Sequence, residues 1–119
     1  MAPTQLSKAE KAELTESENI LTAPTITKYQ TAAEITKNSL LEIITQVVAG
    51  AIPKEVCIAA NTAILAKCAK VYQKTPTGIA FPCCISVNNV LCHDDQNETP
   101  LAAGDIVRVE LGAHIDGYF

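Results

Sequence analysis

The chain has 119 residues, of which 48% are hydrophobic and 18% are charged, and its net charge is −4 at pH 7. This composition is typical of a globular domain, and the acidic balance argues against nonspecific attraction to nucleic-acid phosphates. No apolar run is long enough to form the core of a signal peptide or to span a bilayer. We therefore predict a soluble, intracellular protein with no membrane partner.

Five cysteines occur in the chain, an odd number that suits a reducing compartment. A zinc site built from Cys83, Cys84, Cys92 and His93 is one alternative. These residues lack the Cys-x-x-Cys spacing of zinc knuckles, and neighbouring residues on a strand point to opposite faces. We therefore interpret the cysteines as small apolar residues with structural roles.

The N-terminal part of the chain is polar and rich in lysine and glutamate, which predicts a flexible leader over residues 1–26. A helix is predicted over Thr27–Val48, because apolar residues recur there at helical intervals. Thr27 and Gln30 have the spacing of a capping box at its start. Gly50 stands where a left-handed C-terminal cap is expected.

A second helix is predicted over Pro53–Tyr72, since proline is favoured at a first helical position. Its apolar face is expected to pack against that of the first helix. Pro76 and Gly78 then indicate a loop. From Ile79–Pro82 the periodicity changes, and this short apolar run is stopped by its proline.

The remaining sequence has the pattern of strands and turns. Ile85–Val87 alternates as a strand does, and Ile106–Leu111 is the clearest strand of the chain. Asp116 and Gly117 predict a hairpin turn with a returning strand just begun. Because an open apolar sheet edge is an unfavourable end, we expect residues 27–119 to be part of a domain that further chain, or a partner, completes.

Four segments, taken in order, carry a resemblance to a known family. They are Thr27 to Ala33, Gly78 to Pro82, Ile85 to His93 and Gly104 to Gly117. In this order and spacing they resemble the pita-bread superfamily of methionine aminopeptidases. The likeness is greatest to the proliferation-associated branch, the non-peptidase homologues of the type 2 enzyme. It covers Thr27 to Phe119, and it corresponds to the N-terminal part of the family fold.

The resemblance implies an α+β protein in which helices pack on a curved antiparallel sheet, the pita-bread or creatinase/aminopeptidase fold. Active members hold two metal ions with two Asp, one His and two Glu. The first Asp falls at the position of Glu110, and the other ligands fall beyond Phe119. A glutamate places its carboxylate about one C–C bond further out, which disturbs a paired-metal site. We therefore expect no metal and no cofactor, with Glu110 left as an inward polar residue in a former active site.

His93 follows Asn88 and Asn89 at the spacing of the family's substrate-contacting histidine. That histidine donates a hydrogen bond to the scissile peptide, a role that suits a neutral imidazole. The alternative, which we favour, is a cavity-facing histidine without a reaction to perform. His114 matches a position that supports the hairpin. Asp94 and Asp95 are more acidic than the enzymes at this point, which also argues against substrate binding.

The function implied by the resemblance is that of a non-catalytic adaptor rather than an enzyme. Relatives bind the large ribosomal subunit, structured RNA or regulatory proteins in ribosome assembly and growth regulation. We expect a cytoplasmic location, with nuclear and nucleolar sites in addition, and no small-molecule substrate. Two alternatives remain open: a truncated metal-dependent methionine aminopeptidase of the second type, and an isolated fragment without function.

Overall fold

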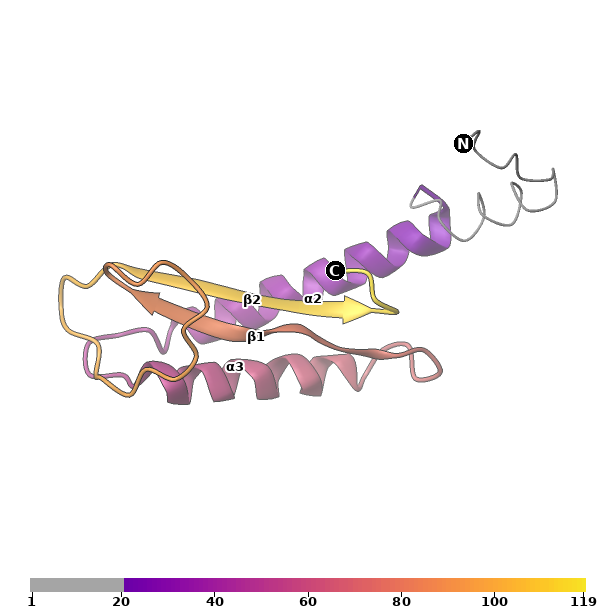
Figure 1. Ribbon diagram of the computed structural model, residues 1–119. Helices are drawn as coiled ribbons and strands as arrows, with labels where there is room; N and C mark the ends of the chain where they lie inside the picture. Colours follow the sequence, from indigo (N-terminus) through magenta and orange to yellow (C-terminus); the bar gives the residue numbers. More distant parts are fainter. Residues whose placement is uncertain (1–20) are drawn as a thin grey trace, which may run out of the picture.

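The computed structural model describes residues 21–119, which form two helices and a two-stranded antiparallel sheet (Figure 1). In chain order the elements are α2 (Ala23–Ile44), α3 (Pro53–Cys68), β1 (Thr77–Val87) and β2 (Val107–Ile115). A loop of residues 88–106 joins the two strands. The α+β class predicted from the sequence is therefore confirmed.

Helix α2 begins one turn before the predicted start at Thr27. Thr22 is the extended N-cap residue and Pro24 lies in the first turn, where a missing N–H costs nothing. The predicted capping box at Thr27 and Gln30 is wrong, because Thr27 lies inside the helix and its hydroxyl donates to the Ala23 carbonyl at 2.9 Å. Residues 23–26 of the predicted leader are helical, and residues 1–20 lie outside the described part of the chain.

Both helices end earlier than predicted. Helix α2 stops at Ile44 rather than Val48, and the chain leaves it through short turns such as the bond from Gln46 N–H to Ile43 O. Gly50 has the expected positive φ of 89°, yet it serves the following loop, where its N–H donates to Leu101 O at 2.7 Å. Helix α3 ends at Cys68, before the left-handed Tyr72 with φ 47°.

Strand β1 is longer than the sequence indicates, because it runs without interruption through Pro82. The strand accommodates the proline with two register shifts, one between Ile79 and Phe81 and one between Phe81 and Cys84. Bulges tolerate a residue that has no N–H to donate. The two apolar segments that the sequence separates are thus one strand.

Strand β2 also continues past the predicted end at Leu111, as far as Ile115. It then turns through Asp116 (φ 54°) and Gly117 (φ 82°), and Tyr118 forms a bridge with Ile115. Two left-handed central residues define the tight hairpin turn that matches strand twist. The predicted hairpin is confirmed.

The core lies between the helices and one face of the sheet, here called the helix face (Figure 1). Four of its isoleucines, Ile43, Ile64, Ile85 and Ile115, are at most 1% exposed. They come from α2, α3, β1 and β2 respectively, so each element contributes to one continuous cluster. The predicted packing of the two helices by their apolar faces is confirmed at Ile43 and Ile64.

Candidate functional site

The opposite face of the sheet carries the residues that the sequence singled out. Because side chains alternate along a strand, the register pairs Cys84 with Glu110, Ser86 with Arg108 and Gly78 with His114 on this face. The first part of the connecting loop, residues 88–94, lies against this face, and we call it the loop face. The two candidate residues meet here, one from β2 and one from the loop.

Glu110 and His93 are brought together although 17 residues separate them. The His93 backbone N–H donates to Glu110 Oε2 at 3.5 Å, and its Nδ1 lies 3.9 Å from the same oxygen. His93 adopts a left-handed backbone with φ 61°, which directs its N–H toward the strand. The imidazole is 78% exposed and the carboxylate 41% exposed, so water weakens this contact. The two side chains therefore lie on an exposed surface and not in an enclosed catalytic pocket.

The surroundings of Glu110 are acidic and partly buried. Its cross-strand partner Cys84 is 6% exposed, and its thiol has a raised pKa. Burial is the main cause, and the negative charges of Asp95, Glu110 and Asp94 add to it. The thiol stays protonated at neutral pH, so Cys84 is not an activated nucleophile.

A paired-metal centre, as implied by the family resemblance, requires several ligands converging on one point. Among residues 21–119, no three His, Cys, Asp or Glu side chains lie close enough together to hold an ion. Glu110 supplies one carboxylate, and its Oε2 already accepts the His93 N–H. The described residues therefore do not fit that centre by themselves.

Hydrogen bonds at both ends of the His93 segment hold the loop in place, and the sequence analysis predicted none of them. Asp94 O accepts the Ile85 N–H at 2.7 Å, which fixes the residue after His93 on the outer edge of β1. At the other end, Asn88 donates from Nδ2 to Asp105 at 3.0 Å, and Arg108 donates to the carbonyls of Asn88 and Val90. Asn88 and Asn89 are residue types common in turns, and they are the sequence signal for this arrangement.

The hairpin after β2 is tied down by side chains, as predicted for His114. Its Nδ1 accepts the Gly117 N–H at 3.1 Å. Lys28 of α2 forms an ion pair with Asp116 at 2.7 Å, and hydrogen bonding to that carboxylate raises the pKa of the lysine. The rings of Tyr29 and Tyr118 lie 5.1 Å apart. His114 therefore has a structural contact of its own.

All five cysteines are free thiols in the structure. Cys57, Cys68, Cys83 and Cys84 are buried, whereas Cys92 is exposed. Cys83 belongs to the helix-face core and Cys84 lies on the loop face, as expected for neighbouring residues of a strand. Hydrogen bonding with Cys57, followed by burial, raises the pKa of the Cys83 thiol. These positions agree with the structural interpretation of the thiols.

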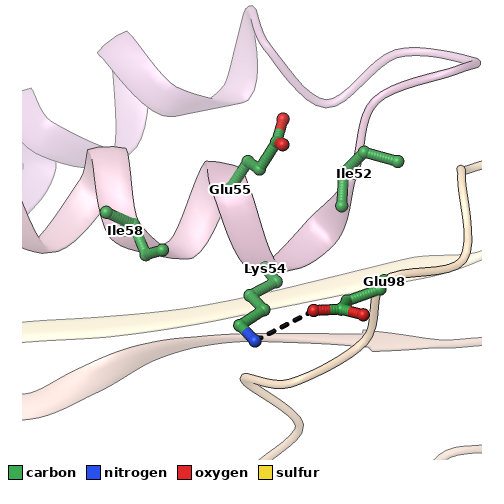
Figure 2. Close-up of a pocket in the computed structure, with 5 residues that line it drawn as sticks. All are labelled: Ile52, Lys54, Glu55, Ile58 and Glu98. Atoms are coloured by element: carbon green, nitrogen blue, oxygen red, sulfur yellow. Dashed lines mark hydrogen bonds and ion pairs between the residues drawn. The ribbon is translucent and has the colours of Figure 1, made fainter.

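A hollow of about 390 Å³ lies at the start of α3 (Figure 2). Lys54 and Glu98 point toward each other across it and form an ion pair at 3.0 Å. Glu55, Ile52 and Ile58 complete the lining. The sequence analysis assigned no function to any of these residues. The hollow has charges of both signs but no convergent set of polar groups, so it defines no reaction.

Comparison with known proteins agrees with this architecture. Residues 27–119 match the model of metallopeptidase family M24. The chain is 36% identical over 111 residues to ERBB-3 binding protein 1 from Solanum tuberosum, covering 87% of this chain and 29% of that protein. It is 37% identical over 99 residues to proliferation-associated protein A from Dictyostelium discoideum, covering 78% and 26%.

A solved structure, of a thermophilic Arx1, has 30% identity and a TM-score of 0.72, and the match covers 82% of this chain and 28% of that one. The chain therefore belongs to metallopeptidase family M24, and the predicted resemblance to the N-terminal part of the pita-bread fold is confirmed. It spans less than a third of the length of these relatives. Enzymes also occur among the relatives: a methionine aminopeptidase from Borreliella burgdorferi is 32% identical over 94 residues, which cover 79% of this chain and 38% of that protein.

No helix between residues 21 and 119 combines the length and apolar character needed to cross a bilayer.

Proposed function

We propose that the chain acts as a non-catalytic, binding member of family M24, an adaptor of the proliferation-associated type. Glu110 is the observation that carries this proposal. It stands where the resemblance implies the first aspartate ligand, and its carboxylate faces an exposed histidine instead of further ligands. The names of the relatives, ERBB-3 binding protein 1 among them, support a binding role.

The partner that we propose is a ribosomal particle. Structured RNA and regulatory proteins are the alternative partners. The Arx1-like architecture and the proliferation-associated relatives support this choice. The acidic net charge argues that recognition depends on particular contacts rather than on general attraction to RNA. The proposed location is the cytoplasm, with nuclear and nucleolar sites in addition.

Co-sedimentation with purified ribosomal subunits tests the binding role. We expect the chain to sediment with large subunits and to remain in the supernatant with small subunits at the same concentration. Treatment of the pellet with ribonuclease separates an RNA partner from a protein partner. Equal recovery with both subunits, or none with either, would contradict the proposal.

The competing function is that of a metal-dependent methionine aminopeptidase, which the similarity to the Borreliella enzyme favours. Release of methionine from a Met-Ala-Ser peptide, with cobalt or manganese added, decides between the two. We expect no turnover above a protein-free control from the wild-type chain or from Glu110→Asp, which restores only the ligand type. Turnover that Glu110→Ala abolishes would establish the enzyme instead.

A further inference from the structure

Two buried thiols, Cys57 of α3 and Cys83 of β1, lie side by side in the core. Cys57 is 2% exposed and Cys83 is 0% exposed, and both belong to the helix-face cluster. Their side chains are joined by a hydrogen bond. Two thiols in contact have a reaction open to them that a single buried thiol lacks, because they can form a disulfide.

The path of α3 along β1 brings the two thiols together. Near the end of α3, the Cys68 thiol donates to the Gly78 carbonyl at 3.7 Å. About two turns earlier in the helix, Asn61 Oδ1 accepts the Cys83 N–H at 2.8 Å. The helix and the strand therefore run antiparallel (Figure 1). Cys57 precedes Asn61 by one turn on the same side of α3, so it reaches this part of β1. The contacts of other residues thus place the two thiols together, independently of their own hydrogen bond.

The surroundings of the two thiols favour different roles for them. The hydrogen bond from Cys83 lowers the pKa of the Cys57 thiol, although burial and the negative charges of Asp95 and Asp94 act against it. The same bond, followed by burial, raises the pKa of the Cys83 thiol. The thiol with the lower pKa is the better nucleophile. Cys57 is therefore the first sulfur to react, and Cys83 is the resolving thiol beside it.

A polar segment of the connecting loop, residues 94–98, passes over the start of α3 beside this pair. The Lys54 N–H donates to Asn97 O at 2.9 Å, and the Lys54 ammonium group forms an ion pair with Glu98 (Figure 2). Surface ion pairs of this kind are weak, and segments held by exposed bonds open locally more often than the core does. Opening of this segment would let a small oxidant reach Cys57.

We propose that Cys57 and Cys83 form a site of reversible oxidation, at which hydrogen peroxide converts the two thiols into a disulfide that joins α3 to β1. The Cys57 sulfur attacks one peroxide oxygen, so that an S–O bond forms and the O–O bond breaks. The leaving hydroxide takes the Cys57 proton and becomes water.

The Cys83 sulfur then attacks the Cys57 sulfur. An S–S bond forms, the S–O bond breaks, and the hydroxyl group leaves with the Cys83 proton as a second water. Two electrons pass from the pair of sulfurs to the peroxide. This inference goes beyond the binding role proposed above and does not depend on it.

Peroxide treatment of the folded chain, followed by mass spectrometry, tests the proposal. The chain carries Cys92→Ser throughout, because that exposed thiol would otherwise be oxidised first. We expect the intact mass to fall by about 2 Da, the mass of the two hydrogens lost. A non-reduced peptide map should contain Cys57 joined to Cys83, and dithiothreitol should restore the original mass.

The neighbouring cysteine of β1 provides a matched control. Cys57→Ala or Cys83→Ala should lower the yield of disulfide at least about tenfold, since a disulfide requires both sulfurs. Cys84→Ala changes the next residue, on the loop face, and should leave the yield unchanged. Circular dichroism shows whether each variant is folded. If an alanine variant unfolds, the peptide map of the Cys92→Ser chain decides alone.

The opposite results are equally defined. Absence of a disulfide after prolonged treatment of the folded chain overturns the proposal. A product in which Cys57 is joined to Cys68 or Cys84 also overturns it. The chain unfolded in urea should give such mixed pairings, so the same mixture from the folded chain would show that the fold does not select Cys83.

Discussion

The two faces of the sheet differ in how far their side chains are buried and in what they contact. On the helix face, Ile64, Ile85 and Ile115 are fully buried, and their neighbours are apolar residues of α2 and α3. On the loop face, His93 is largely and Glu110 partly open to water, and the two are joined by long, weak contacts. Packing therefore constrains the first face, whereas the second combines buried positions such as Cys84 and Ser86 with an open region around His93. Substitutions can test this division directly.

The largest expected effect belongs to the helix face. Ile64→Ala removes a side chain with no exposed surface from the centre of the core. We expect a loss of about 2–4 kcal/mol in the free energy of unfolding, because the cavity that remains cannot collapse fully. Chemical denaturation measures it. Leu65→Ala, next to it and 51% exposed, is the control and should cost less than about 1 kcal/mol. Equal losses would mean that α3 packs with a different face.

Periodicity was sufficient to predict the helix face, because apolar residues recur where the helices and strands bury them. The same reasoning failed at element ends. Thr27 has capping chemistry, but Pro24 begins the helix a turn earlier, and Pro82 reads as a stop although bulges carry β1 past it. On the loop face, the contact between Glu110 and His93 depends on the path of the connecting loop, which the local sequence does not determine. The two residues were identified by resemblance, and their contact came only from the structure.

A smaller effect is expected where the loop face is closely packed. A Cβ added at Gly112 would lie 2.5 Å from Cε1 of Phe81, its cross-strand partner. Gly112→Ala must therefore displace the ring, and since Phe81 is 40% exposed, the ring has space to move. We expect a loss of about 1–2 kcal/mol by thermal or chemical unfolding.

The same site offers a double-mutant test of that cause. Phe81→Leu in the Gly112→Ala background should recover most of the loss, because the smaller side chain no longer meets the added methyl group. If the double variant is as unstable as the sum of the single variants, the penalty arises from the backbone at residue 112 and not from the ring.

Two buried serines, one in a helix and one in a strand, allow the effect of the same substitution on stability to be compared. Ser39 of α2 and Ser86 of β1 are both 0% exposed, and neither hydroxyl has a hydrogen-bond partner among residues 21–119. Replacing an unsatisfied hydroxyl with a methyl group removes a desolvation cost. Ser39→Ala should raise the free energy of unfolding by about 0.5–1 kcal/mol, since alanine also favours the helix.

Ser86→Ala should change stability less than Ser39→Ala, because alanine is a poor strand residue and offsets part of the gain. Both variants can be measured in one series of urea titrations. A loss above about 1 kcal/mol at either position would show that its hydroxyl is hydrogen-bonded in solution.

The smallest effect concerns the polar end of the loop. Asp105 accepts the Ala102 backbone N–H at 2.8 Å and the Asn88 side-chain amide at 3.0 Å, and these bonds lower its pKa below the ordinary 3.8. A carboxyl group whose pKa is lowered on folding stabilises the folded state above its unfolded pKa. That contribution is lost as the pH falls below 3.8 and through the folded value. Asp105→Asn should therefore melt slightly below the wild type at pH 6, and the two curves should converge toward pH 2. The titration of the Asp105 carboxyl carbon by NMR gives the pKa directly. A melting difference that is the same at pH 6 and pH 2 would show that the loop is held on its face by shape rather than by this charge.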